Sequence, residues 1–171
     1  DWGSLRSAAN AAFSAALYHD AFVDKSALDF ARSQADYILG NNEYKRSFIV
    51  GWGHNPPTRP HHKNAWGQDS WFDTHSVPLY SLVGALVGGP HTNHYTDSYG
   101  LTSPPGYQDI MTDYICNEVT LDYNAGLLGV LAAFASQTAN ACNSSDANTA
   151  VTTHTAADVT DAPQPSNPTT L

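Results

Sequence analysis

The chain has 171 residues, which is the size of one domain or of part of one. Hydrophobic residues make up 42% of it, enough for a core, whereas only 13% of the residues are charged. The formal net charge is −9 and the longest basic cluster is Lys45-Arg46, so neither nucleic acid nor an anionic membrane is an expected partner. The sequence contains no run of 18 apolar residues that would predict a transmembrane helix.

Two amphipathic helices are predicted in the first 40 residues. Apolar residues recur at helical spacing over residues 4–19, and Ser4 is a suitable N-cap for this first helix. A second helix is predicted over residues 26–39, with Ser26 as its cap and Gly40 as part of its stop signal. Each helix should bury one face.

Two more helices are predicted later in the chain. The uncharged segment 78–87 ends at a Gly-Gly-Pro sequence and is interpreted as a buried helix, although a buried strand also fits so short a run. The strongest helical pattern covers residues 118–136 and is apolar nearly all round, so this helix should be buried among others. No strand pattern appears, and the predicted fold class is therefore all-α with long loops.

The loops 43–75 and 91–117 carry the residues of chemical interest. The second contains Asp109 and Asp113 and leads to Glu118 and Asp122, which would share one face of a helix. Like charges at that spacing are costly unless one carboxyl is protonated, and a neutral carboxylic acid among aromatic rings can serve as a general acid. The alternative is that these acids cap the N-terminus of a buried helix. The residues alone leave both open.

The first loop holds His54, His61 and His62 among tryptophans and an arginine. Adjacent histidines of an extended chain point to opposite sides, and the loop has no helically spaced ligand pair, so a metal site is not predicted. Aromatic faces beside hydrogen-bond donors suit a groove for sugars. Core packing is the alternative for at least one tryptophan.

Residues 1–140 are predicted to be the folded portion, and residues 141–171 a disordered, low-complexity linker or tail rich in Ser, Thr and Pro. Cys116 and Cys142 could form one disulfide, and Asn143 begins a single N-glycosylation sequon.

Several segments together resemble glycoside hydrolase family nine, a family of cellulases whose catalytic domain is an (α/α)6 barrel. They are residues 30–42, the glycine- and proline-rich loop with His61 and His62, residues 86–90 and residues 117–125. The resemblance covers residues 1–136 in order. It implies that this chain is the C-terminal part of such a barrel, or roughly its last third.

The resemblance implies hydrolysis of internal β-1,4-glucosidic bonds in cellulose or related β-glucans, with inversion. Glu118 matches the family's general acid, His61 the histidine that contacts the sugar, and Asp109 a signature aspartate with a supporting role. An inverting enzyme needs a second carboxylate as base. In the family this base lies upstream, so the remaining N-terminal part of the catalytic domain, on the same or a separate chain, is an expected partner.

Further residues are expected to bind the glucan: Trp52, His54, Arg59, His62, Lys63, Trp66, Tyr107 and Tyr114. Lys63 and Met111 stand where the family usually has arginines, and the loop 91–106 is longer than usual, with His91 in place of a common aspartate. These departures motivate an alternative function, that of a truncated or diverged relative that binds polysaccharide or self-assembles without catalysis.

No cofactor is required for the implied chemistry. Family members often carry structural calcium, so the resemblance implies such an ion, although the sequence has no calcium loop of the EF-hand type. A polymeric substrate, the sequon and the tail together predict a secreted, extracellular protein.

Overall fold

The computed structural model describes residues 2–67 and 77–149, with the side chains of residues 2–67 and 77–138. The elements, in order, are α1 (Ser4–Phe22), α2 (Lys25–Leu39), α3 (Lys63–Trp66), β1 (Tyr95–Thr96), β2 (Thr102–Ser103), α4 (Tyr114–Asn117) and α5 (Leu121–Thr149). The chain divides into two units, Asp1–Gln137 and Thr138–Leu171. The first unit contains all the elements that position the candidate site.

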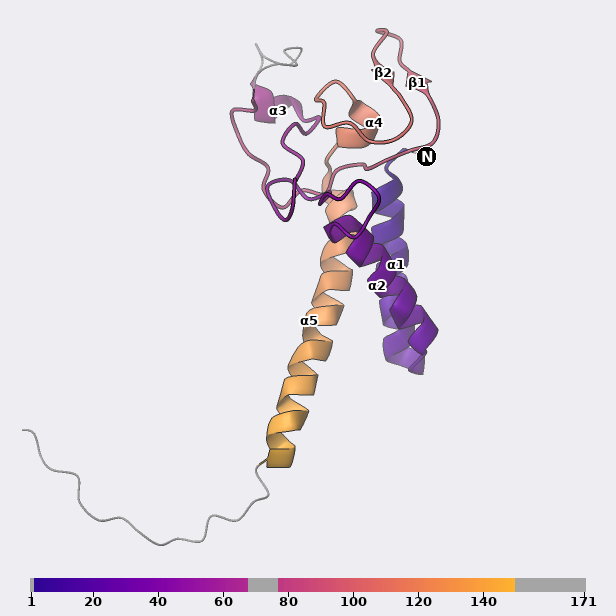
Figure 1. Ribbon diagram of the computed structural model, residues 1–171, viewed down its shortest axis with the longest axis vertical. Coiled ribbons are helices and arrows are strands. Elements are labelled where there is room, and N and C mark those ends of the chain that lie inside the picture. The colour runs from indigo at the N-terminus through magenta and orange to yellow at the C-terminus, as the bar shows by residue number, and fades with distance from the viewer. Residues whose placement is uncertain (1, 68–76, 150–171) are drawn as a thin grey trace, which may run out of the picture. The chain divides into compact units, whose positions relative to one another are not determined.

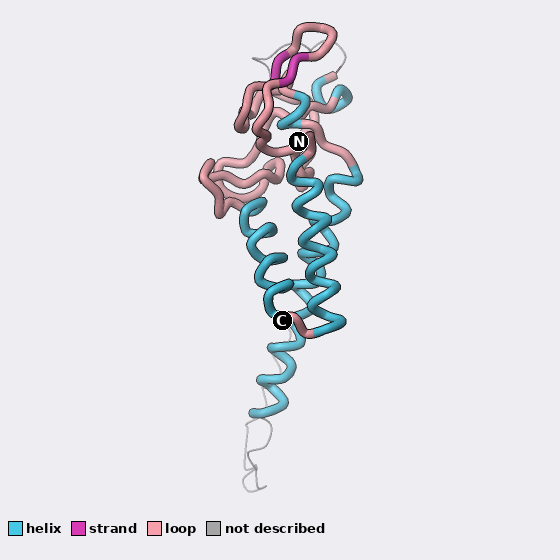
Figure 2. The backbone as a smooth tube through the Cα atoms, turned by 90° about the vertical axis from the view of Figure 1, so that its right-hand side faces the viewer, coloured by secondary structure: helices cyan, strands magenta, loops and turns pink. Residues whose placement is uncertain are grey.

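Within this first unit the long helices lie side by side, and the short elements gather near the N-terminal ends of α1 and α5 (Figures 1 and 2). α2 runs antiparallel to α1. The buried residues of α1 are Leu5, Ala9, Ala12 and Ala16, and those of α2 are Ala31, Ala35 and Ile38. Both predicted helices are therefore confirmed, and their small buried side chains let the two backbones approach closely.

The predicted N-caps of these helices are wrong. Asp24, not Ser26, caps α2, because its side chain accepts hydrogen bonds from the amides of Ser26 and Ala27 at 2.8 and 3.1 Å. Hydrogen bonds from Ser26 and Ala27 lower the pKa of Asp24. Gly3 occupies the cap of α1 at φ 64°, while the Ser4 hydroxyl donates to the Pro90 carbonyl at 2.7 Å.

Glycines let α5 pack closely on α1. A Cβ atom on Gly126 would lie 2.3 Å from Asn10 Oδ1 and 2.7 Å from the Asn10 amide nitrogen, and one on Gly129 would lie 2.8 Å from the Phe13 ring. Farther round the helix, Leu121 and Leu128 are 92% and 71% exposed. The helix begins three residues later than predicted and is buried on one side in the described part of the chain.

The predicted helix over residues 78–87 is wrong. This segment has no helical residues: it turns at residues 83–84, and the backbone that follows pairs with residues 48–50. The Val50 amide donates to Ala85 O at 2.9 Å, and the Val87 amide to Phe48 O at 3.2 Å. Gly84 at φ 89° interrupts the run, and Val87 is fully buried. An apolar run without helical periodicity here satisfies much of its backbone through a segment that is distant in sequence, and not through the repeated local hydrogen bonds of a helix.

The structure also bears on two other predictions, the absence of strands and the tail that begins at residue 141. The short antiparallel pair of β1 and β2 contradicts the expectation of no strands. α5 continues to Thr149, into the segment predicted as a tail. Residues 150–171, the loop with Trp71, and the side chains of Cys142 and Asn143 lie outside the described residues, so the predicted boundary at residue 140 stays a prediction. None of the helices among the described residues is sufficiently long and apolar to span a membrane.

Candidate active site

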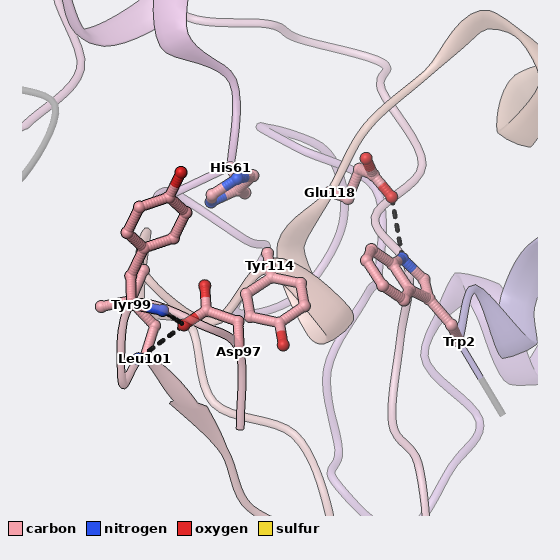
Figure 3. Close-up of a pocket in the computed structure, with 7 residues that line it drawn as sticks. All are labelled: Trp2, His61, Asp97, Tyr99, Leu101, Tyr114 and Glu118. Atoms are coloured by element: carbon pink, nitrogen blue, oxygen red, sulfur yellow. Dashed lines mark hydrogen bonds between the residues drawn. The ribbon is translucent and has the colours of Figure 1, made fainter. Parts of the chain in front are cut away.

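A pocket of about 680 Å³ opens at the loop end of the first unit (Figure 3). Its lining residues are Trp2, His61, Asp97, Tyr99, Leu101, Tyr114 and Glu118. They come from segments that are far apart in the sequence. Three of them, His61, Tyr114 and Glu118, are among the expected site residues, and the other four are not.

Glu118 does not lie on the long helix. It follows α4 with φ −59° and ψ 140°, an extended conformation, and α5 begins only at Leu121. The expectation that Glu118 and Asp122 share a helix face is therefore wrong. Asp122 is 62% exposed and pairs with Arg6 at 3.4 Å, whereas Glu118 faces the pocket.

One carboxylate oxygen of Glu118 accepts two hydrogen bonds. Trp2 Nε1 donates to Oε2 at 2.8 Å, and the Tyr123 hydroxyl donates to the same atom at 3.1 Å. Burial, followed by the proximity of Glu118, raises the pKa of Tyr123 to about 12, so this phenol keeps its proton at neutral pH. Because both donors occupy Oε2, the oxygen available to carry a proton toward a ligand is Oε1.

His61 is fixed next to Glu118 by its backbone and by its ring. Its amide donates to the Asn117 carbonyl at 2.7 Å, and His61 and Glu118 form an isolated parallel bridge. Its ring Nδ1 lies 2.7 Å from Met111 O. A carbonyl only accepts, so Nδ1 carries a hydrogen, and in the neutral ring Nε2 is an acceptor. His62 lines a different hollow, as expected for adjacent histidines on an extended chain.

Asn117 is the fully buried hub of the segment that carries Glu118. Its Nδ2 donates to Gln108 O, Ile110 O and Asp113 O at 2.6, 3.0 and 3.2 Å, and its Oδ1 accepts from the Tyr107 hydroxyl at 2.8 Å. Every polar group of this side chain is therefore satisfied. Sequence reasoning missed this role, since nothing local to Asn117 distinguishes a hub from a surface asparagine.

Asp109 lies away from the pocket and holds the segment that leads to His61. Its carboxylate accepts hydrogen bonds from the Thr58 amide and hydroxyl, both at 2.9 Å, and from the Arg59 amide at 3.0 Å. Arg46 pairs with it at 3.8 Å. This geometry suits a positioning residue, in line with the supporting role that the resemblance implies.

Most of the other expected glucan-binding residues lie outside this pocket. Trp66 is fully buried and donates through Nε1 to Pro60 O at 2.7 Å, so its ring has no exposed face for a sugar. The Tyr107 ring packs against the Arg46 guanidinium, 4.7 Å from its centroid, and Trp52 lines a separate apolar hollow. His54, Arg59 and Lys63 also do not line the pocket with Glu118.

A buried polar cluster is formed by His91, Asp113 and Cys116. Ligand-type atoms of His91, Asp113 and Cys116 lie within 4.8 Å of one another, and the Ser103 hydroxyl donates to Asp113 and lies 2.6 Å from His91 Nε2. Burial raises the pKa of the free Cys116 thiol to about 12. Nitrogen and sulfur donors do not suit calcium, which takes oxygen ligands, so this cluster does not fit the expected ion.

Comparisons with known proteins show to which family the chain belongs. The model of glycosyl hydrolase family 9 matches residues 1–131. The chain is 43% identical over 138 residues to endoglucanase B of Cellulomonas fimi and 45% identical over 132 residues to an endoglucanase of Dictyostelium discoideum. Each match covers 77% of this chain, but only 12% and 17% of the respective relative.

Solved structures show the same relationship. The chain resembles the catalytic domain of Clostridium thermocellum CelT with a TM-score of 0.65 at 37% identity, covering 77% of this chain and 25% of that one. It resembles the cellulase Cel9M of C. cellulolyticum, solved with cellobiose, with a TM-score of 0.65 at 40% identity, covering 78% and 28%. Such catalytic domains are (α/α)6 barrels. This chain belongs to glycosyl hydrolase family 9 and spans only part of its catalytic domain.

Proposed function

We propose that this chain supplies the general acid of an endoglucanase that cleaves internal β-1,4-glucosidic bonds with inversion. The observation that carries the proposal is the placement of Glu118 in a pocket with its Oε2 held by Trp2 and Tyr123. The names of the relatives, which are endoglucanases, support the substrate class.

Glu118 would protonate the departing glycosidic oxygen through Oε1. The two donors on Oε2 stop the carboxyl from rotating, so its proton is directed toward the bond to be broken. His61 Nε2 would accept a hydrogen bond from a sugar hydroxyl, since Met111 O fixes the hydrogen on Nδ1. Tyr114, whose ring lies 6.1 Å from that of His61, would pack against the sugar ring.

The base that activates water would come from the remaining part of the catalytic domain. Inverting enzymes place their two carboxyl groups roughly 6.5–9.5 Å apart. Exposed apolar side chains on α1 and α5, such as Phe22, Leu121 and Leu128, would pack against that remaining part. A polymeric substrate of this kind would require a secreted enzyme.

The test is a Glu118→Gln substitution in the enzyme that carries this chain, assayed on soluble β-glucan. Glutamine keeps the shape and the acceptor for Trp2 but has no acidic proton. We expect kcat to fall by roughly 10²–10⁴-fold with cello-oligosaccharide binding retained.

Asp122→Asn is the matched control, because it removes a carboxylate four residues away that does not line the pocket. It should leave kcat within about twofold of the parent, as expected for an exposed surface substitution. Substantial turnover in Glu118→Gln would refute the assignment of Glu118. An α-anomeric first product, detected by NMR, would support inversion, and a β-anomeric one would exclude it.

A further inference from the structure

The connection between Gly-Gly-Pro and the acid forms a hairpin that reaches the pocket. β1 and β2 pair antiparallel, with Tyr95 opposite Ser103 and Thr96 opposite Thr102. The turn at residues 97–101 supplies three of the residues that line the pocket with Glu118: Asp97, Tyr99 and Leu101. This is the loop whose length departs from the family pattern.

The hairpin is attached to the segment that carries the acid. Ser103 of β2 donates to Asp113 and lies 2.6 Å from His91 Nε2. Asp113 in turn caps α4, accepting from the Cys116 amide at 3.2 Å, and α4 ends at the residue before Glu118. Ser103, His91 and Asp113 are all buried, so their hydrogen bonds are costly to break. The hairpin is therefore held in a fixed position relative to Glu118.

The same anchor fixes the base of the hairpin on its other side. His91 and Gly106 exchange backbone hydrogen bonds at 3.2 and 2.8 Å, and the His91 ring packs edge-on against Tyr95 at 5.1 Å. His91 stands where the family commonly has an aspartate, and here it contacts Ser103 of the longer loop. The two departures from the family pattern, His91 and the longer loop, are thus in direct contact with each other.

The turn presents one carboxylate oxygen and one aromatic ring. Asp97 Oδ1 accepts from the amides of Tyr99 and Leu101, both at 2.9 Å, which fixes the turn. Oδ2 makes no hydrogen bond with the part of the chain that the structure describes. The Tyr99 side chain is 88% exposed, and Figure 3 shows the Asp97 carboxylate between the rings of Tyr99 and Tyr114. Burial and then the charge of Asp97 raise the pKa of Tyr114.

We propose that this hairpin is a substrate-specificity element, in which Asp97 Oδ2 accepts hydrogen bonds from the hydroxyls of a glucosyl unit beside the scissile bond and Tyr99 packs on that unit. A carboxylate acceptor between aromatic faces suits a neutral, hydroxyl-rich ring. It disfavours a glucan that carries carboxyl groups, because like charges repel at short range. This inference rests on the proposed function of Glu118.

Two substitutions in the active enzyme test it. Asp97→Asn keeps an oxygen for the amides of Tyr99 and Leu101 while replacing the second oxygen with NH2, so the turn is preserved. We expect KM for neutral cello-oligosaccharides to rise on the order of tenfold, the loss of a charge-assisted hydrogen bond. Tyr99→Ala should raise KM about twofold to tenfold. In both variants kcat should change little.

A charged substrate supplies a readout that loosened structure would not mimic. The ratio of kcat/KM on carboxymethylated glucan to that on neutral glucan should rise in Asp97→Asn and stay at the parent value in Tyr99→Ala. Thr102→Ala is the control, because Thr102 lies in β2, is exposed and does not line the pocket. It should match the parent on both substrates.

The outcomes separate this proposal from the one on which it rests. If the parent enzyme cleaves glucan through Glu118 but both hairpin variants keep the parent KM and charge ratio, the hairpin proposal is wrong. A loss of kcat in Asp97→Asn as large as that in Glu118→Gln, with KM unchanged, would also overturn it and would place Asp97 in the chemical step. Failure of the function itself would appear as an inactive parent or an active Glu118→Gln variant.

Discussion

The helical end of the first unit consists of α1, α2 with residues 40–42 that follow it, and the first turns of α5, and its loop end consists of residues 43–67 and 77–120. The two ends are stabilised by different kinds of interaction. α1, α2 and the first turns of α5 pack through alanines and glycines, and their backbone hydrogen bonds are local. At the loop end, backbone and side chains bond to partners far away in sequence. Trp2 reaches Glu118 across 116 positions, and Asp109 reaches Thr58 across 51.

This difference explains where the chemistry lies. Local hydrogen bonds fix a helix but bring no distant groups together, whereas the long-range bonds of the loop end place His61, Tyr114 and Glu118 in one pocket. The helices serve as the rigid support from which those loops extend. Substitutions that disturb the pocket at the loop end should therefore lower kcat, whereas substitutions at the helical end should lower stability alone.

The largest loss of unfolding free energy is expected at the loop end, from Asn117→Ala. The change leaves the carbonyls of Gln108 and Ile110 and the Tyr107 hydroxyl without their buried partner, which should cost about 3–5 kcal/mol of unfolding free energy. Activity should fall as well, because Glu118 follows this hub directly. Chemical denaturation and kcat measured together would check this.

A matched substitution is Asn42→Ala, since Asn42 also donates to two carbonyls but does so beside α2. It should lower stability while leaving the kcat of the folded fraction unchanged. Equal losses of kcat in the two variants would contradict the separation of the two ends.

At the helical end, Gly126→Val should lower the unfolding free energy by about 2–3 kcal/mol. Its side chain would collide with the backbone of Asn10 on α1, and overpacking of this kind forces the helices apart. Ala125→Ser at the neighbouring exposed position is the control. A thermal shift of Gly126→Val no larger than that of Ala125→Ser would show that α1 and α5 do not pack as described.

Trp2→Phe should have a smaller effect, and one confined to catalysis. Phenylalanine keeps a ring against Tyr114, 5.1 Å away, but removes the Nε1 donor to Glu118. We expect kcat to fall on the order of tenfold, with KM and thermal stability close to the parent values. Trp52→Phe, which alters a tryptophan outside the pocket, should leave kcat unchanged. Equal kcat values for the two variants would show that the Trp2 hydrogen bond does not assist Glu118.

The helices were predictable and the pocket was only partly so. Helical periodicity identified α1, α2 and the core of α5, because amphipathic spacing is a local property. The same reasoning failed for residues 78–87, because the backbone of Ala85 and Val87 bonds to Val50 and Phe48, more than 30 positions earlier. A lone apolar run does not reveal such a partner.

The site followed a similar division. The motifs around His61 and Glu118 carried the family resemblance, and both residues line the pocket. Trp2, Asp97 and Tyr99 were missed, because no spacing relates them to Glu118 and only the folded chain brings them together. The buried position of Trp66 also could not be read from the sequence, since one tryptophan in an aromatic loop resembles another.

The smallest effect concerns Cys116. Its thiol pKa is raised from 9.0 to about 12 by burial, so the proton is held more tightly in the folded state. Its contribution to stability is complete below about pH 9 and is lost as the pH rises through 12. In a Cys142→Ser background, Cys116 should not react with a thiol reagent at pH 8 until the protein is unfolded. Rapid modification of the native protein would show that this thiol is not buried.

The assignment of Glu118 as the general acid is best tested by comparing substrates with different leaving groups in the Glu118→Gln variant. When a cello-oligosaccharide is cleaved, the departing sugar needs a proton on its glycosidic oxygen, whereas fluoride or dinitrophenolate can depart without one. If Glu118 is the general acid, the kcat of the variant should fall by roughly 10²–10⁴-fold on the oligosaccharide, whereas most of the parent kcat should be retained on cellobiosyl fluoride. Equal losses on both substrates would contradict the account and would assign Glu118 a role in binding or folding instead.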